Sequence, residues 1–286
     1  MFQFWKWELR MAETEWEVTG STRLYVVIGD PVAQVRAPEL LNPLFVHSEM
    51  DAIVVPLHVR QDQLDDLLPV LMQTENLDGI LVTIPHKFAV CRHVSRVSPA
   101  VEKAGCANAL RRTNQGWEAE NFDGAGFVQG LSARGFNPGG QSVLIVGCGG
   151  AGASIAAGLL DAKPKSIDLF DAQVNRGQIL AERLSGAALS VRALEELSGP
   201  LAYDLIVNAT PLGLTPTDPL PIPVDRIEGA LVADVIMKPR ETALLKRAQE
   251  RGLRTHLGVH MLDAQIEMYS AFFGITHERE RVEARQ

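Results

Sequence analysis

The chain has few cysteines, no long apolar run and no excess of positive charge, and each absence excludes a class of protein. Its three cysteines, Cys91, Cys106 and Cys148, lack the spacing of a metal site. We therefore expect no metal, no disulfide framework and a reducing, cytoplasmic compartment. No apolar stretch reaches the ~18 residues that cross a membrane as a helix. The net charge of -8 argues against nucleic acid or an anionic membrane as a partner. A monomer or homodimer that binds a small molecule is the class that remains.

Length and composition allow two globular domains. The chain has 286 residues, of which 46% are hydrophobic and 22% charged, as in ordinary globular proteins. Residues 1–10 are too short and too interrupted by charge for a secretory signal. Two readings stay open for them: Met11 is the natural start, or the segment is an arm on the surface. We treat residues 1–19 as an N-terminal extension and expect the charged tail, 276–286, to fray.

Strand and helix patterns alternate along the chain, which predicts an α/β fold with mostly parallel sheets. Short β-branched runs predict the strands, and leucines at helical spacing predict the helices. The expected strands are residues 23–28, 52–57, 79–84, 106–110, 117–121, 143–146, 166–171, 204–208, 231–236 and 254–257. The expected helices are residues 37–50, 61–74, 127–133, 174–184, 241–252 and 261–273, with one more after the glycines near residue 150.

One strand–turn–helix stretch is the most informative part of the chain. A buried strand runs into Gly147, Gly149 and Gly152, and an alanine-rich helix follows. In a dinucleotide-binding turn these glycines allow a tight turn, close approach of a pyrophosphate and close helix–strand packing. The alternative is a glycine-rich turn of another α/β unit. Dinucleotide binding is favoured because the next strand ends in Asp171, 24 residues after Gly147, where an acid accepts from ribose hydroxyls.

Seven short motifs then occur in one order. They are VIGDPVA (27–33), VTIPHK (82–87), GCANAL (105–110), NFDG (121–124), GCGGAG (147–152), NATPLG (208–213) and MLDAQ (261–265). Together they resemble the shikimate/quinate dehydrogenase family from about Leu24 to Phe273. The resemblance implies an N-terminal α/β substrate domain and a Rossmann-type dinucleotide-binding domain with a cleft between them. We place the substrate domain at 20–125 plus 259–286 and the NAD(P)-binding domain at 126–258.

The resemblance also implies a catalytic pair, Lys87 and Asp123. A lysine held beside a carboxylate in a cleft is able to orient a hydroxyl group and exchange its proton. By residue type alone, Lys87 reads as a solvated lysine and Asp123 as a helix N-cap. We expect Lys87 to lie away from the glycine turn, in the substrate domain.

Further contacts follow from the same family pattern. Thr83, Asn108 and Gln265 match its polar substrate contacts, and an amide is able to orient a ring hydroxyl by donating and accepting. Asn108 closing a turn and Gln265 as an ordinary helix residue are the alternatives, and His86 is read as structural. The expected cofactor contacts are Gly147, Gly149, Gly150, Ala151, Gly152, Asp171, Asn208, Thr210, Gly258 and Met261.

The predicted cofactor is NAD, with NADP less favoured. In family members that use NADP, the second strand ends in an Asn-Arg-Thr-like run, whereas this chain has Asp171, Ala172 and Gln173 there. A carboxylate accepts from ribose hydroxyls and repels a phosphate. Arg176 is the feature that would favour NADP.

The substrate region departs from the family pattern. The two serines that hold a substrate carboxylate in the family are Val35 and Ala37 here, and three further polar positions are Leu81, Phe122 and Met237. Arg36 is a candidate replacement contact for a carboxylate or a surface arginine.

Three functions remain open. The chain is a shikimate/quinate-type dehydrogenase, a dehydrogenase of another cyclic or aromatic hydroxy-acid, or a non-catalytic nucleotide-binding regulator. The retained Lys87 and Asp123 argue against the third.

Overall fold

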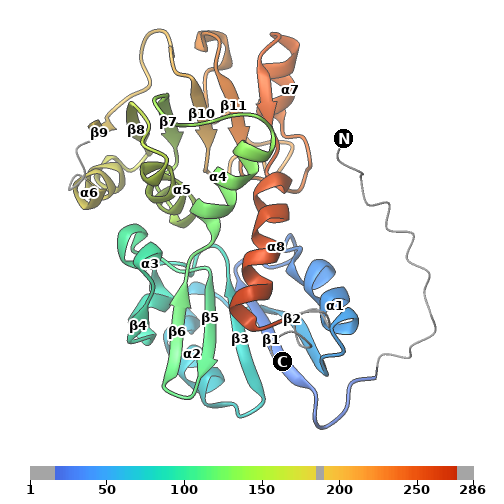
Figure 1. The fold of residues 1–286 in the computed structure, drawn as a ribbon. Coiled ribbons are helices and arrows are strands. Elements are labelled where there is room, and N and C mark those ends of the chain that lie inside the picture. Colours follow the sequence, from blue (N-terminus) through green and yellow to red (C-terminus); the bar gives the residue numbers. More distant parts are fainter. Residues whose placement is uncertain (1–16, 185–189, 276–286) are drawn as a thin grey trace, which may run out of the picture.

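The computed structural model describes residues 17–184 and 190–275. Most of the expected N-terminal extension and the charged tail lie outside the described residues. Within them, no helix is long and apolar enough to cross a membrane. Two six-stranded sheets, one in each half of the chain, confirm the predicted α/β fold with two sheet-based units (Figure 1).

The first sheet is mixed: a parallel core is followed by two antiparallel pairings, and the short edge strand β4 pairs with β6 in parallel. Its order is β2-β1-β3-β5-β6-β4, with β1 parallel to both β2 and β3 and with β3, β5 and β6 antiparallel in succession. The strands are β1 (Arg23–Gly29), β2 (Ala52–His58), β3 (Leu77–Val82), β4 (Arg96–Val97), β5 (Ala109–Thr113) and β6 (Gly116–Glu120). Its helices are α1 (Ala37–His47), α2 (Leu64–Gln73) and α3 (Pro99–Ala104), with 3-10 turns η1 (Gln61–Gln63) and η2 (Ala89–His93).

The second sheet is parallel throughout and has the doubly wound order β9-β8-β7-β10-β11-β12. The strands are β7 (Ser142–Val146), β8 (Ser166–Phe170), β9 (Ser190–Leu194), β10 (Leu205–Asn208), β11 (Leu231–Asp234) and β12 (Arg254–His256). Its helices are α5 (Gly150–Asp161), α6 (Val174–Leu184) and α7 (Ala243–Glu250), with η3 (Val224–Arg226). The strand order reverses between β7 and β10, and ligands bind at the carboxyl ends of strands at such a point.

Two helices connect the halves. Helices α4 (Asp123–Ala133) and α8 (Val259–Phe273) lie against one another between the two sheets (Figure 1). Met261, near the start of α8, belongs to the core of the second sheet, whereas Phe273 at its end packs into the core of the first. Because one helix contributes to both cores, it ties the position of one sheet to the other.

Several boundaries differ from the sequence prediction. Helix α4 begins at Asp123 and not at Phe127, because Asn121 Oδ1 accepts from the Asp123 N–H at 3.0 Å and forms the turn that opens the helix. Helix α3 was not predicted, although Ser98 caps it and Gly105 ends it with a φ of 74°. Strand β5 begins three residues later than expected, at Ala109.

The end of β12 contains a buried histidine that should make the fold sensitive to acid. His256 is 2% exposed, and burial, together with the charges of His260 and Arg134, lowers its pKa from 6.5 to about 4. Above pH 6.5 the ring is neutral in both states. Below it the unfolded chain binds the proton first, so stability falls as the pH approaches 4.

We expect a loss on the order of 3 kcal/mol across that window, at about 1.4 kcal/mol per pKa unit. Urea unfolding at a series of pH values measures it. His256→Phe, which keeps a ring against Phe127, should flatten the decline. Equal declines in both proteins would contradict the assignment.

Candidate active site

A buried ion pair lies between the two halves of the chain. Lys87 follows β3 in the loop of residues 83–88, and its Nζ donates to Asp123 Oδ2 at the first turn of α4. The two side chains are 15% and 4% exposed. A buried pair of this kind persists only when further hydrogen bonds satisfy the charges.

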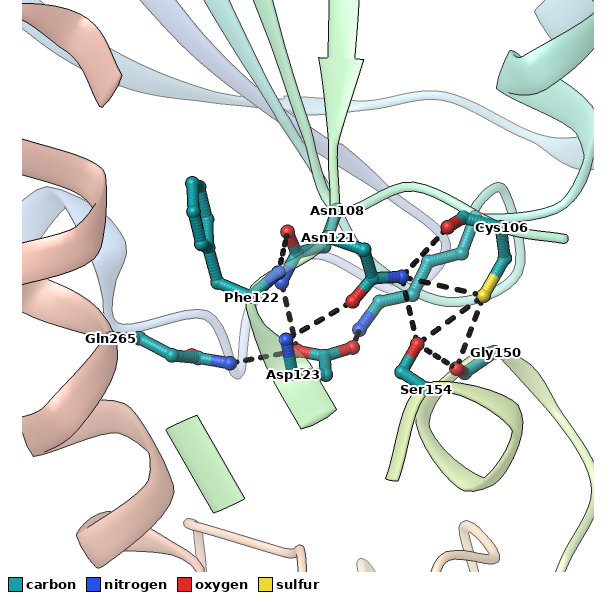
Figure 2. Close-up of polar contacts among 9 residues, drawn as sticks. Cys106, Asn108, Asn121, Phe122, Asp123, Gly150, Ser154 and Gln265 are labelled. Carbon is teal, nitrogen blue, oxygen red and sulfur yellow. Dashed lines mark hydrogen bonds and ion pairs between the residues drawn. The ribbon is translucent and has the colours of Figure 1, made fainter. Parts of the chain in front are cut away.

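Two amides supply those hydrogen bonds to Asp123. Asn108 Nδ2 donates to Asp123 Oδ1 at 2.9 Å, and Gln265 Nε2 donates to the same oxygen at 2.8 Å (Figure 2). Asn108 precedes β5, Asp123 opens α4 and Gln265 lies on α8, so three segments far apart in sequence converge on one carboxylate. The structure thus brings together four of the predicted site residues.

The orientation of Asn108 is fixed by its other amide atom. Its Oδ1 accepts from the Phe122 N–H at 3.0 Å, which leaves Nδ2 to face Asp123. Tyr269 on α8 is a neighbour that the sequence did not identify. Burial and the charge of Asp123 raise the pKa of Tyr269 well above 10, and Asn108 opposes that rise.

The structure does not bring every predicted substrate residue to this carboxylate. Arg36 forms an ion pair with Glu39 at 3.3 Å in the first turn of α1. The Thr83 methyl group packs close to Gly29. His86 Nε2 lies 2.7 Å from the Val59 carbonyl oxygen, as expected for a structural histidine.

The glycine turn after β7 has the geometry that its residues predict. Gly147 has a φ of 100°, which favours glycine, and a Cβ on Gly152 would lie 1.8 Å from the Gly147 carbonyl oxygen. A Cβ on Gly149, in contrast, would meet no atom within 4 Å. The backbone before α5 is therefore open on one side at the helix N-terminus, as a pyrophosphate requires.

Asp171 is engaged with the turn itself. Its Oδ2 accepts from the Cys148 N–H at 2.8 Å and its Oδ1 from the Gln173 N–H at 2.9 Å. Both carboxylate oxygens therefore hold backbone in place. The Asp171 carboxylate therefore stabilises the glycine turn whether or not a ribose is bound.

The loop after β10 is also internally braced. Asn208 Oδ1 accepts from the backbone and hydroxyl of Thr210, while Asn208 Nδ2 donates to Asp234 Oδ2 at 3.1 Å. Burial raises the pKa of Asp234. Gly258 lies against the backbone of residues 235–236, where a Cβ would come within 2.5 Å of the Ile236 oxygen. These contacts keep the loops at the switch point in place.

The ion pair and the glycine turn are in contact. A Cβ on Gly150 would lie 2.9 Å from Lys87 Cβ and 2.9 Å from Lys87 Cδ. The expectation that Lys87 lies away from the glycine turn is therefore wrong. Parallel-sheet geometry explains the contact, because the turn projects from the end of β7 that faces the first sheet (Figure 1).

Fold and site together define the class. A doubly wound sheet with an open glycine turn, beside a buried lysine–carboxylate pair, is the arrangement of a two-domain α/β oxidoreductase.

Comparison with known proteins identifies the family. Residues 27–110 match the model described as the shikimate dehydrogenase substrate binding domain. A shikimate dehydrogenase (NADP(+)) of Acidiphilium cryptum is 36% identical over 265 residues, covering 91% of this chain and 93% of the relative. One from Geobacter metallireducens is 33% identical over 260 residues, covering 88% and 91%. The chain belongs to the shikimate dehydrogenase family.

Solved structures agree with that assignment. Shikimate dehydrogenase from Aquifex aeolicus has a TM-score of 0.80 at 25% identity, covering 90% of this chain and 95% of that one. A ligand-free 5-ketofructose reductase of Gluconobacter sp. strain CHM43 has a TM-score of 0.75 at 25% identity, covering 88% and 92%.

The prediction of NAD as the cofactor is contradicted. The curated relatives carry NADP(+) in their names. The physical reason for the error is the role of Asp171, which braces the glycine turn and so does not by itself indicate recognition of a ribose without a phosphate.

Proposed function

We propose that the chain catalyses reversible, NADP-dependent oxidation of a ring secondary alcohol to a ketone, with shikimate, quinate or a related hydroxy-acid as substrate. One observation carries the proposal: the buried Lys87–Asp123 pair touches Gly150 of the glycine turn. Hydride transfer requires a group that exchanges the hydroxyl proton and lies in the same site as the bound nucleotide. The same contact argues against a regulator that only binds nucleotide.

The residues of the pair have distinct roles in this proposal. Lys87 Nζ binds the reacting hydroxyl group and exchanges its proton, and Asp123 holds the ammonium group toward it. Asn108 and Gln265 fix the Asp123 carboxylate through Oδ1, and both amides lie beside the place that we assign to the substrate hydroxyls. Thr83 and Arg36 are weaker candidates, since Arg36 pairs with Glu39.

The second sheet holds the nucleotide in this account. When bound, NADP supplies the hydride acceptor. The open backbone at Gly149 and the N-terminus of α5 face the pyrophosphate. The remaining contacts that we propose are Gly147, Gly150, Ala151, Gly152, Asn208, Thr210, Gly258 and Met261. Residues 126–258 then form the nucleotide domain and residues 20–125 with α8 the substrate domain.

Arg176 should distinguish NADP from NAD. It lies in the first turn of α6, and its positive charge acts on Cys148 in the glycine turn. Because a hydrogen bond to a charged group contributes roughly 1.5–3 kcal/mol, Arg176→Ala should weaken NADP binding by roughly 10-fold or more. NAD binding, measured by the same calorimetric titration, is the control and should not change. Equal losses for both nucleotides would contradict the role.

A different ring alcohol is the second candidate substrate, and the packing near the site favours it. Val35 and Ala37 lie against an apolar cluster that contains Leu81 and is also contacted by Phe122. Apolar side chains cannot hydrogen-bond a carboxylate or a polyol, and a site that lacks those partners loses discrimination for them. The related 5-ketofructose reductase structure shows that the fold also accommodates a substrate outside the shikimate series.

Restoring hydroxyl groups tests the substrate. Two lost hydrogen bonds to a charged group cost roughly 3–6 kcal/mol, so activity on shikimate should be poor. The double change Val35→Ser plus Ala37→Ser should lower the Michaelis constant for shikimate and leave that for NADP unchanged. A wild-type constant for shikimate in the low micromolar range would instead favour shikimate itself as the natural substrate.

A further inference from the structure

Asn121 connects three segments of the site through its amide group. Its Nδ2 donates to Ser154 Oγ at 2.7 Å and to the Cys106 carbonyl oxygen at 2.7 Å, and its Oδ1 accepts from the Asp123 N–H at 3.0 Å (Figure 2). Asn121 is 4% exposed. Both amide hydrogens and the amide oxygen are therefore used inside the protein.

Ser154 continues the connection into the second half of the chain. It lies on α5, is 3% exposed, and donates to the Gly150 carbonyl oxygen at 2.7 Å. The Cys106 thiol lies 3.3 Å from both Ser154 Oγ and the Gly150 oxygen. A chain of hydrogen bonds thus runs from the backbone of Asp123 to the glycine that touches Lys87.

The helices meet at the same place without room to slide. A Cβ on Gly124 would lie 2.1 Å from the Ser154 carbonyl oxygen, and a Cβ on Gly158 would lie 2.8 Å from the Gly124 Cα. The first turn of α4, which carries Asp123, therefore rests directly on α5. The Asn121–Ser154 hydrogen bond joins the two segments at this same contact.

We propose that Asn121 and Ser154 are positioning residues that hold the Asp123 carboxylate, and with it Lys87, in register with the glycine turn. This inference rests on the proposed function. The substrate is held by the first half of the chain and the nucleotide by the second, so hydride transfer depends on the register between them. A misplacement of about 1 Å is able to cost on the order of 10²-fold in rate.

Ser154→Ala tests the link with little risk to folding, because it removes one hydroxyl and leaves the Asn121 bonds to Cys106 and Asp123 intact. Ser132→Ala is the matched control. Ser132 lies on α4, and its hydroxyl group donates to the Val128 carbonyl oxygen, four residues earlier, at 3.0 Å. Unlike Ser154, it does not connect α4 to α5.

Two measurements are needed, one of which does not depend on turnover. Amide hydrogen exchange in residues 121–127 should become faster in Ser154→Ala, without substrate or nucleotide, and stay unchanged in Ser132→Ala. In steady-state assays, Ser154→Ala should lower kcat roughly 10-fold or more, with a larger primary deuterium isotope effect. The Michaelis constant of the alcohol and the NADP affinity should stay within about twofold.

The outcomes separate the inference from the function on which it rests. If amide exchange in Ser154→Ala equals that in Ser132→Ala, the Asn121–Ser154 hydrogen bond does not hold the start of α4. If exchange is faster in Ser154→Ala but kcat is unchanged, the two residues do not position the catalytic pair. A third outcome is that none of the ring alcohols supports NADP reduction by the wild-type chain, while amide exchange still becomes faster in Ser154→Ala. The proposed function then fails, and the contact serves only the conformation of α4.

Discussion

Replacing Lys87 with methionine is expected to remove most turnover, by about 10²–10⁴-fold, which is the range of a general acid–base contribution. Methionine keeps the unbranched stem that packs against Gly150 but has no proton to exchange. The effect should therefore fall on kcat, with NADP affinity nearly unchanged. Steady-state kinetics on the best substrate and calorimetric titration with NADP measure the two quantities.

Alanine at the same position separates chemistry from packing. Lys87→Ala also removes the stem beside Gly150, so we expect the same loss of kcat and an additional change in NADP affinity. Lys103→Ala is the control, because it breaks an exposed lysine–aspartate pair with Asp161 and should not alter kcat. Near-normal rates in Lys87→Met would show that the lysine is not catalytic.

Replacing Gly152 with alanine should lower both the stability of the fold and the affinity for NADP. The added methyl group would lie 1.8 Å from the Gly147 carbonyl oxygen. That neighbour is backbone, so no side chain is able to move aside, and the turn must rearrange. We expect a loss in the free energy of unfolding of about 3 kcal/mol or more and no measurable NADP binding.

Gly149→Ala adds the same methyl group to the same turn and is the matched comparison for Gly152→Ala. Its methyl group would meet no protein atom within 4 Å, so the free energy of unfolding without nucleotide should stay close to that of the wild type. NADP affinity should nevertheless fall, because the methyl group lies where the backbone approaches a pyrophosphate. Urea unfolding and calorimetric titration of both variants measure the contrast. Wild-type NADP affinity in Gly152→Ala would contradict the account of the turn.

The sequence predicted the fold well because most signals were local. The β-branched run before Gly147 and the glycines after it define β7, the turn and α5 by their own conformational preferences. Errors arose where tertiary contacts decide a boundary. Helix α4 begins four residues before the predicted start because Asn121 closes its first turn. Strand β9, at one edge of the second sheet, was not predicted because its residues have little strand pattern of their own.

The site was harder to predict, since its members are far apart along the chain. Gln265 donates to a carboxylate 142 residues away, and no local pattern predicts such a contact. The family resemblance predicted Gln265 as a substrate contact but not its hydrogen bond to Asp123. Asn121 belongs to the NFDG motif, but its hydrogen bond to Ser154 depends on how α4 crosses α5. Asp171 misled the cofactor prediction because residue type does not show which group a carboxylate accepts from.

The formation of NADPH by the wild-type chain tests the central claim most directly. NADP and NAD are offered separately with shikimate, quinate, aminoshikimate and simpler hydroxy-acids, and the absorbance of the reduced nicotinamide is followed beside Lys87→Met. The account predicts reduction of NADP in preference to NAD with at least one ring alcohol, and loss of that activity in Lys87→Met. Reduction of neither nucleotide by any of these alcohols, or equal rates in the two proteins, would contradict it.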